Sequence, residues 1–449
     1  MELIDDFSVR AKKYFANNDT SPVYPFPPSV EALGQLNSPL QEESLPTQEV
    51  LALLDGIGSP ATVRSSGGRY FGFVTGGSLP AALAAKLLAT VWDQNTALSV
   101  MSPAAISLED ISATWLISVL GLPENTGVGF VTGATMANFT AIVSARQHVL
   151  KSEGWDVESK GLFQAPEITV ITGDEAHASL LRALKLAGFG LERIVRVPTD
   201  DQGRIIVERF PAVNGPTIIC VQAGNVNTGA FDDVSSICDK VKNKNAWVHV
   251  DAAFGLWAAA SPKYKWLTKG IEKADSWGAD AHKWLNVPYD CGLVFVKNKN
   301  ALVDAMASTA AYLPTTTLRE PFQYGPEMSR EARGVSVWAA LKSLGKKGLA
   351  ELIERNCSQA RRFADALKKA GYSILNDVVI NQVLVSFGDA ETTLRVIKVV
   401  QESGVCWCGG TVWHGKTAMR ISVSSWATTD DDVEKSVEAI LTLAAREIS

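Results

Sequence analysis

Two polar residues that could act together, a lysine and an aspartate, each follow an apolar run near the middle of the chain. Lys283 lies in the run ADAHKW at 279–284, and Asp251 lies in HVDAA at 249–253. A lysine amine can condense with the aldehyde of pyridoxal phosphate to give an internal aldimine. An aspartate beside the pyridine nitrogen keeps this nitrogen protonated, so that the ring can accept electrons from a carbanion. Either fragment alone is more often a surface pair or a turn, but both in this order predict a pyridoxal phosphate site.

A third candidate is the run FVTGATMAN at 130–138, which reads as a strand, a turn of small residues and a helix start. Gly133 permits close backbone approach, and the unpaired N–H groups of the helix from Ala134 suit a phosphate. Thr135 adds a hydroxyl group. An ordinary strand-to-helix turn is the alternative interpretation.

His177, in GDEAHAS at 173–179, begins an expected helix. At the mouth of a sheet it could stack on a flat ring or contact a substrate carboxylate, although capping and core histidines are more common. The chain has five histidines, and two of them, His148 and His249, are expected to be structural. The remaining site candidates are His177, His282 and His414.

The bulk composition restricts the class of protein. The net charge of −6 over 449 residues gives no electrostatic reason to bind nucleic acid or an anionic membrane. The acidic N-terminus lacks the features of a signal peptide, and no window approaches the roughly 18 uncharged apolar residues of a membrane span. The six cysteines do not form a disulfide framework, and Cys406 and Cys408 lack the second ligand pair of a zinc site, so no metal is expected. We therefore expect a reduced, cytoplasmic enzyme.

The chain divides into three parts by pattern. Prolines crowd residues 1–60, which predicts an irregular, extended segment that wraps a partner. Residues 61–327 alternate apolar strands with helices, typical of an α/β domain whose sheet is parallel or mixed and buried on both faces. Residues 328–449 are predicted to form a smaller C-terminal α+β domain.

These motifs resemble the group II pyridoxal-phosphate decarboxylases, which include the aromatic amino acid, histidine and glutamate decarboxylases. The resemblance rests on DAHKW and HVDAA, and extends to GFVTGGSLP at 72–80, GAFD at 229–232 and RGV at 333–335. The lysine-tryptophan pair is more similar to the aromatic and histidine branch. The resemblance implies a fold-type I homodimer, with a mainly parallel seven-stranded sheet in its large domain and pyridoxal 5′-phosphate as cofactor.

The resemblance also implies roles for individual residues. Lys283 is the Schiff-base lysine and Asp251 the partner of the pyridinium nitrogen. Ala253 packs on one face of the ring and His177 stacks on the other. Ala134 and Thr135, with Asp280, match the phosphate-binding positions. Gly133 and His282 are further candidate cofactor residues, from the turn and histidine patterns described above.

Other positions concern the substrate. Thr75 matches a substrate contact, and Phe73 belongs to a group of aromatic residues that hints at an aromatic substrate. Tyr312 matches the tyrosine of a mobile loop that helps protonate the carbon after carbon dioxide has left. Arg420 could hold the α-carboxylate or form a structural salt bridge, and Val226 departs from the family, which often has a threonine there.

The sequence therefore predicts an enzyme that decarboxylates an L-amino acid to an amine. Transamination, oxidative deamination to an aldehyde and capture of the carbanion by an electrophile are alternatives on the same cofactor. A non-catalytic protein that kept the fold is an alternative of another class.

Overall fold

The computed structural model describes residues 2–18, 20–308 and 319–448. Its packing divides the chain into two compact units. Unit 1 comprises Met1–Thr75, Gln359–Leu375 and Val383–Ser449, and unit 2 comprises Gly76–Ser358 and Asn376–Gln382. The sequence predicted divisions after residues 60 and 327, and these units group the residues differently. The predicted division concerns parts that fold independently, and it stays a prediction.

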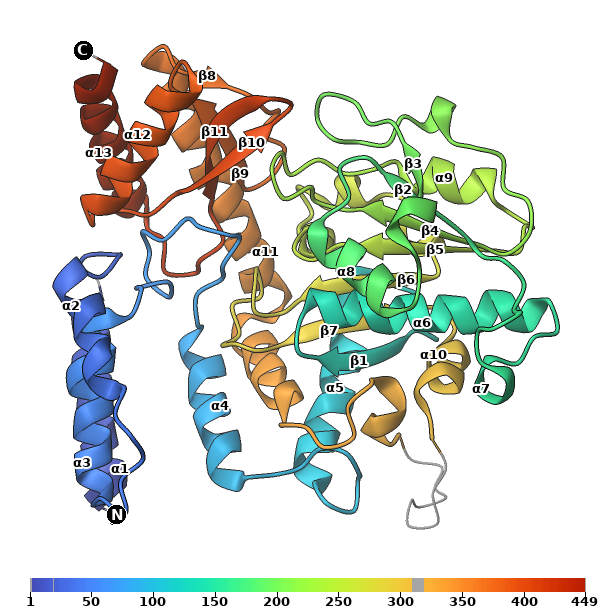
Figure 1. The fold of residues 1–449 in the computed structure, drawn as a ribbon, viewed down its shortest axis with the longest axis horizontal. Coiled ribbons are helices and arrows are strands. Elements are labelled where there is room, and N and C mark those ends of the chain that lie inside the picture. Colours follow the sequence, from blue (N-terminus) through green and yellow to red (C-terminus); the bar gives the residue numbers. More distant parts are fainter. Residues whose placement is uncertain (1, 19, 309–318, 449) are drawn as a thin grey trace. The chain divides into compact units, whose positions relative to one another are not determined.

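Unit 2 is built on a seven-stranded sheet with the strand order β1-β7-β6-β5-β4-β2-β3 (Figure 1). The pairs from β6 to β3 are parallel, whereas β7 is antiparallel to both β1 and β6. Apolar residues on both faces explain why these strands, apart from the short edge strand β3, are almost fully buried. The mainly parallel sheet predicted from the sequence is confirmed. The strands are β1 (Gly127–Val131), β2 (Thr169–Gly173), β3 (Val195–Val197), β4 (Thr217–Gln222), β5 (Ala246–Asp251), β6 (Ser276–Asp280) and β7 (Gly292–Val296).

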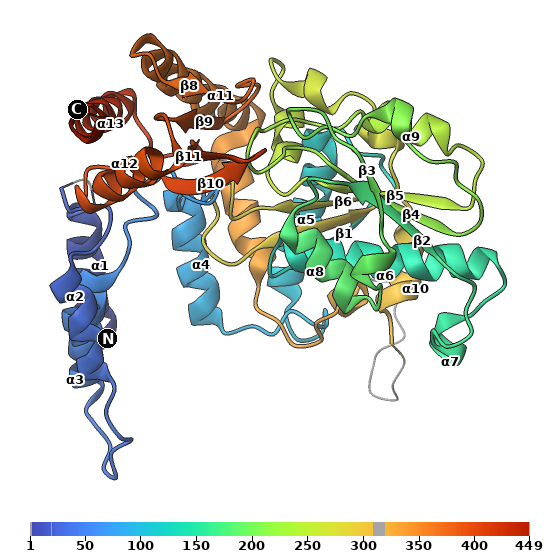
Figure 2. The same ribbon diagram turned by 45° about the horizontal axis from the view of Figure 1, so that its top comes forward.

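Helices α6, α8 and α10 pack over one face of this sheet, and Figures 1 and 2 show α6 beside the strands. Small residues on α6, including Ala137, Ala141 and Ala145, are fully buried and let the helix approach the strands closely. The helices of unit 2 are α4 (Pro80–Trp92), α5 (Pro103–Leu120), α6 (Ala134–Ser152), α7 (Val157–Lys160), α8 (Ala178–Leu186), α9 (Val234–Lys240) and α10 (Lys299–Met306).

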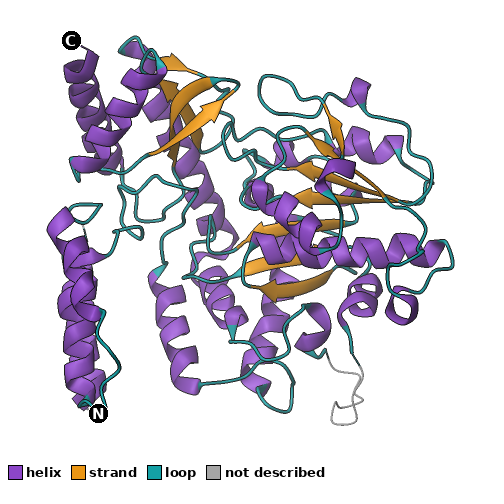
Figure 3. Cartoon of the chain, in the orientation of Figure 1, coloured by secondary structure: helices purple, strands orange, loops and turns teal. Residues whose placement is uncertain are grey.

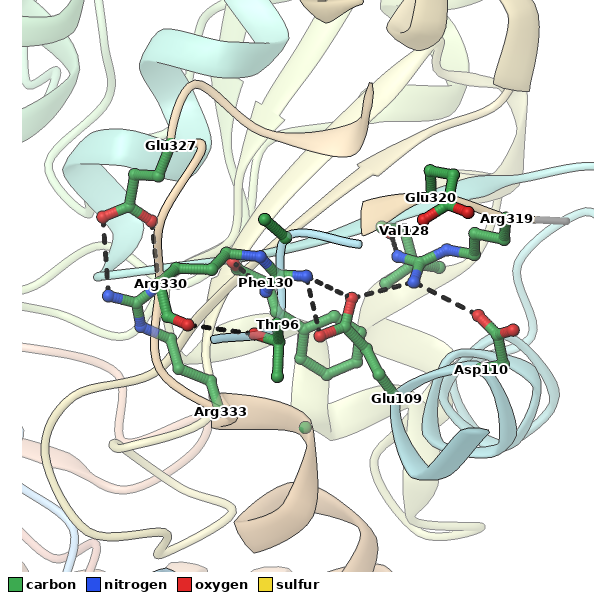
Figure 4. Close-up of polar contacts among 12 residues, drawn as sticks. Thr96, Glu109, Asp110, Val128, Phe130, Arg319, Glu320, Glu327, Arg330 and Arg333 are labelled. Atoms are coloured by element: carbon green, nitrogen blue, oxygen red, sulfur yellow. Dashed lines mark hydrogen bonds and ion pairs between the residues drawn. The ribbon is translucent and has the colours of Figure 1, made fainter. Parts of the chain in front are cut away.

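Strand β1, at one end of the sheet, is held by a buried charge cluster (Figure 4). Glu109 of α5 is 1% exposed and accepts hydrogen bonds from Arg330 (2.7 Å) and Arg319 (2.8 Å). The same arginines donate to β1 carbonyls: Arg319 Nη2 to Val128 O at 2.6 Å, and Arg330 Nη1 to Phe130 O at 3.3 Å. Burial raises the pKa of Glu109, but the two guanidinium groups outweigh it and leave this pKa below its usual value. Glu109 is therefore an ionised carboxylate inside the protein.

Of the helices in the described part of the chain, α5 has the length and apolar composition of a membrane span. It carries Glu109 and Asp110, both paired with Arg319. Because its acidic residues form these ion pairs within unit 2, α5 is a core helix of that unit.

Unit 1 contains a four-stranded sheet with the order β10-β11-β9-β8 and helices α12 and α13 (Figure 3). Leu384, Trp413 and Ala418 form part of its apolar core. Helix α11 (Arg333–Lys369), which bends at Gly345, enters unit 1 at Gln359. The remaining elements are β8 (Ser373–Ile374), β9 (Gln382–Ser386), β10 (Gly409–Trp413), β11 (Lys416–Ser422), α12 (Ala390–Glu402) and α13 (Asp430–Ile448).

The first 60 residues are largely helical, so the prediction of an irregular, extended segment is wrong. Helices α1 (Glu2–Ala16), α2 (Pro27–Glu31) and α3 (Thr47–Leu53) lie there. The prolines start after α1, and Pro27 occupies the first position of α2, where a missing N–H costs no hydrogen bond. Arg10 links α1 to Asp55 at 3.0 Å.

Candidate active site

Two parallel neighbours, β5 and β6, end side by side and carry the predicted lysine and aspartate. Asp251, the last residue of β5, pairs with Gly278 in β6. Ala253 follows Asp251, and its carbonyl accepts the N–H of Asp280 at 2.8 Å. Lys283 stands three residues beyond Asp280. The carboxyl ends of the strands therefore gather these side chains where ligands of open α/β sheets bind.

Lys283 is held by a neighbouring carboxylate. Its Nζ lies 2.9 Å from Asp280 Oδ2, and the lysine side chain is 19% exposed. Burial lowers the pKa of Lys283, but the charge and hydrogen bond of Asp280, with the charge of Asp251, outweigh burial and raise the pKa. The backbone of Gly76 approaches so closely that a Cβ there would collide with the Lys283 carbonyl.

Asp251 is 5% exposed, and its Oδ2 accepts a hydrogen bond from Asn138 Nδ2 at 3.0 Å. Burial raises the pKa of Asp251, while the charges of His177 and Lys283 and the Asn138 hydrogen bond oppose that rise. A cationic ring nitrogen placed beside this carboxylate would stabilise its ionised form in the same way.

The N-terminus of α6 opens onto the same place. An ideal Cβ built on Gly133 would lie 3.3 Å from His282 Cε1 and 3.5 Å from Asp280 Oδ1. The N–H of Ala134 donates to Asp280 Oδ1 at 2.6 Å. Asp280 therefore orients both Ala134 and Lys283. Because a carboxylate repels a phosphate, Asp280 is expected to act on a phosphate through these two groups and not by direct contact. The next N–H group of the helix, that of Thr135, lies in the same first turn.

His282 contacts both Asp280 and Tyr289, and Tyr289 is a residue that sequence reasoning missed. Its Nδ1 accepts the N–H of Cys291 at 3.1 Å, and its Nε2 lies 3.4 Å from Asp280 Oδ1. Burial lowers the pKa of His282 more than Asp280 raises it. The ring centroids of Tyr289 and His282 are 4.4 Å apart, and the charge of the Tyr289 phenol group raises the pKa of Lys283. A tyrosine six residues after the lysine carried no motif that would have identified it.

His177 caps helix α8, as its position in the sequence indicated. Its Nδ1 accepts the N–H of Ser179 at 3.2 Å and lies 2.7 Å from Ser179 Oγ. These contacts fix the ring orientation while leaving His177 close enough for its charge to lower the pKa of Asp251.

Three predicted substrate residues, Phe73, Thr75 and Arg420, belong to unit 1. There the rings of Phe73 and Trp407 stack with their centroids 5.4 Å apart, and Arg420 lies in β11. Burial lowers the pKa of Arg420. Tyr312 lies outside the described residues.

Together, these residues fit pyridoxal phosphate. Lys283 supplies the amine, Asp251 a buried carboxylate for the ring nitrogen, and the α6 N-terminus with His282 a setting for a phosphate. The N–H of Ala253 donates to Asp251 Oδ1 at 3.4 Å, and the charge of His177 acts on Asp251, so both residues lie near this carboxylate. Among the described residues, no cluster of three His, Cys, Asp or Glu side chains could hold a metal ion.

Comparisons with known proteins agree with this geometry. The sequence profile of the pyridoxal-dependent decarboxylase conserved domain matches residues 34–388. An aromatic-L-amino-acid decarboxylase of Bacillus atrophaeus is 30% identical over 314 residues, which cover 67% of this chain and 63% of that relative. A phenylacetaldehyde synthase of Petunia hybrida is 25% identical over 386 residues, or 81% of this chain and 74% of that protein. The crystal structure of Oryza sativa TDC with PLP and tryptamine has a TM-score of 0.90 at 22% identity, covering 100% of this chain and 97% of the other.

Proposed function

Because the chain belongs to the pyridoxal-dependent decarboxylase family, we propose that it converts an L-amino acid into the corresponding amine and carbon dioxide. The chain covers less than two thirds of the length of the Bacillus relative. The observation that carries the proposal is the meeting of Lys283 and Asp251 beside the N-terminus of α6. Pyridoxal 5′-phosphate is the cofactor of this family.

When bound, the cofactor supplies an aldehyde that bonds to a lysine amine and an electron-poor ring that accepts the electron pair left by carbon dioxide. Lys283 provides the amine. Asp251 holds a proton at the ring nitrogen, and its burial excludes water that would weaken this ion pair. His177 limits movement of the ring on one face. Tyr312 is proposed to return a proton to the carbon that lost the carboxylate.

The substrate is proposed to be an amino acid with an aromatic side chain. Phe73, with Thr75, is the proposed side-chain contact, and Phe73 is 64% exposed although it stacks on Trp407. Arg420 is the candidate partner of the α-carboxylate, with a structural salt bridge as its alternative role.

Borohydride reduction followed by peptide mapping tests the lysine assignment. The pyridoxyl group is expected on Lys283, and a label on another lysine would contradict the site. A panel of L-amino acids assayed for carbon dioxide release then identifies the substrate. A protein that shows no absorbance band of bound cofactor would be the non-catalytic scaffold.

An aldehyde product is the second candidate, favoured by the similarity to the Petunia phenylacetaldehyde synthase. Tyr312→Phe separates the two outcomes, because it keeps the ring and removes the phenolic proton. We expect the variant to release carbon dioxide but to consume oxygen and water, yielding aldehyde, ammonia and hydrogen peroxide. If the variant gives amine at the wild-type rate without aldehyde, Tyr312 is not the proton donor. Aldehyde from the wild-type protein would favour the second candidate.

We also propose a cytoplasmic homodimer. Apolar side chains of α1, including Ile4 (65% exposed), Phe7 (43%) and Val9 (66%), face solvent in the single chain, as does Val91 of α4 (72%). Surfaces of this kind are typical of subunit contacts. Ultracentrifugation of the cofactor-loaded protein at micromolar concentration should give a dimer, and a monomer would refute this assignment.

A further inference from the structure

A row of buried polar side chains leads from the far end of β5 to Asp251. Trp247, His249 and Asp251 alternate along β5 and therefore point to the same face of the sheet. Ser276 of β6 and Asn138 of α6 fill the spaces between them. Each of these five residues is at most 5% exposed. This row is called the Asp251 chain below.

Four hydrogen bonds connect the Asp251 chain. Trp247 Nε1 donates to Ser276 Oγ at 2.8 Å, and Ser276 Oγ lies 3.0 Å from His249 Nδ1. His249 Nε2 lies 3.0 Å from Asn138 Oδ1, and Asn138 Nδ2 donates to Asp251 Oδ2 at 3.0 Å. No motif in the sequence indicated these four hydrogen bonds, because they join residues of three separate elements, β5, β6 and α6.

The direction of these bonds follows from the two ends of the row, the indole N–H of Trp247 and the carboxylate of Asp251. An indole N–H can only donate, so Ser276 Oγ accepts it and can give its own hydrogen to His249 Nδ1. Burial lowers the pKa of His249 to about 3, so the ring is neutral and has one donor and one acceptor. With Nδ1 as acceptor, Nε2–H donates to Asn138 Oδ1. The amide nitrogen of Asn138 must then face Asp251.

The reverse direction is unfavourable. If His249 carried its proton on Nδ1, its bare Nε2 would face Asn138 Oδ1, and the amide would have to turn over. Asn138 Oδ1 would then oppose the carboxylate of Asp251, which could relieve the repulsion only by taking up a proton.

We infer that Trp247, Ser276, His249 and Asn138 are positioning residues that keep Asp251 ionised by delivering a hydrogen-bond donor to its Oδ2. Oδ1, which receives the long 3.4 Å hydrogen bond from Ala253 N–H, would then be the oxygen that is available to the cofactor nitrogen. The inference rests on the proposed function, in which Asp251 holds the proton of that nitrogen. The charged groups that act on Asp251 from other elements are Lys283 and His177.

The tautomer of His249 tests the direction without any assay of activity. The protein is labelled with ¹⁵N-histidine, and its five histidines are separated by NMR, with His249→Gln providing the assignment. We expect a proton on Nε2 and none on Nδ1, both with and without pyridoxal phosphate. A proton on Nδ1 would overturn the inference.

A second experiment tests the effect on Asp251. Ser276→Ala removes the link between Trp247 and His249 without touching Asp251. Its matched control is Ser144→Ala, because Ser144 is equally buried but donates within α6 to Thr140 O at 2.9 Å. We expect Ser276→Ala to retain cofactor, to shift its absorbance band and to lower kcat about tenfold with a smaller change in KM. Ser144→Ala should match the wild type in all three.

A Ser276→Ala protein with the wild-type band and a kcat within twofold would overturn the inference. If this variant does not fold, Trp247→Phe removes the first donor instead, and the same criteria apply. A wild-type protein that binds pyridoxal phosphate but decarboxylates no amino acid would refute the proposed function. The His249 tautomer and the cofactor band of the variants would still decide the direction of the Asp251 chain.

Discussion

Lys283 Nζ and Asp280 Oδ2 lie 2.9 Å apart, so the amine that is proposed to bond the cofactor is held as an ion pair by the last residue of β6. The same carboxylate accepts the N–H of Ala134 through its other oxygen. One buried side chain thereby couples the lysine to the N-terminus of α6.

This pairing predicts a pH dependence of cofactor uptake. Asp280 holds the pKa of Lys283 above its usual value against the opposing effect of burial, whereas condensation with an aldehyde requires the neutral amine. Uptake should therefore accelerate as the pH rises. Asp280→Asn removes the charge and is expected to accelerate uptake at pH 7 by about tenfold or more, since one adjacent opposite charge moves a pKa by roughly 1–3 pH units.

Stopped-flow absorbance after mixing apo-protein with pyridoxal phosphate measures this rate. Asp275→Asn is the matched control, because Asp275 stands just before the other end of β6 and accepts the N–H of Val248. Identical pH profiles for wild type and Asp280→Asn would contradict the role of the ion pair.

A second prediction concerns Asp251→Asn. An amide cannot hold the ring nitrogen in its protonated form, so we expect cofactor content to be retained and turnover to fall. The loss should be at least about a thousandfold, or about 4 kcal/mol of barrier at roughly 1.4 kcal/mol per tenfold. Turnover is measured per bound cofactor, and near-normal turnover would refute the assignment of Asp251.

A third prediction concerns stability. Glu109→Gln leaves Arg330 and Arg319 buried beside a neutral amide, and breaking a buried ion pair in this way costs roughly 3–5 kcal/mol. We expect a lower free energy of unfolding in urea, measured on cofactor-loaded protein. Glu351→Gln is the control: Glu351 and Lys347 form an exposed pair at 3.7 Å, and its loss should cost less than about 1 kcal/mol. Equal losses for both variants would show that the Glu109 cluster adds no stability.

The fourth prediction follows from the low pKa of His249. Burial holds this pKa at about 3 in the folded protein, against about 6.5 when unfolded, so the unfolded chain binds more protons between these values. The stability that the neutral His249 contributes is therefore fully present above pH 6.5, and this contribution is lost as the pH falls toward 3. Between pH 7 and pH 5 the loss from this group should be about 2 kcal/mol.

His249→Gln should remove this contribution. The free energy of unfolding is compared at the two pH values, and the wild type should lose about 2 kcal/mol more than the variant. An equal loss in both proteins would mean that His249 takes up no extra proton on unfolding.

The sequence predicted the parts of the site that depend on where strands end. Lys283 and Asp251 close apolar runs, and neighbouring parallel strands bring such ends together whatever the details of packing. Asn138 and Tyr289 were missed because their contacts depend on the rotation of α6 and on the turn after Lys283, which no short pattern specifies. The N-terminal segment was predicted wrongly because its prolines were counted without regard to their position, although Pro27 begins a helix.

The arginines that bind Val128 O and Phe130 O have a consequence beyond the stability of the native state. A strand at the end of a sheet is a template on which another chain can add a strand, and natural proteins block such templates with charged groups. Two guanidinium groups occupy carbonyls of β1 that an incoming strand would need. Loss of Glu109 would weaken the anchoring of both arginines, so such a variant should aggregate during synthesis at concentrations where the wild-type chain remains dispersed.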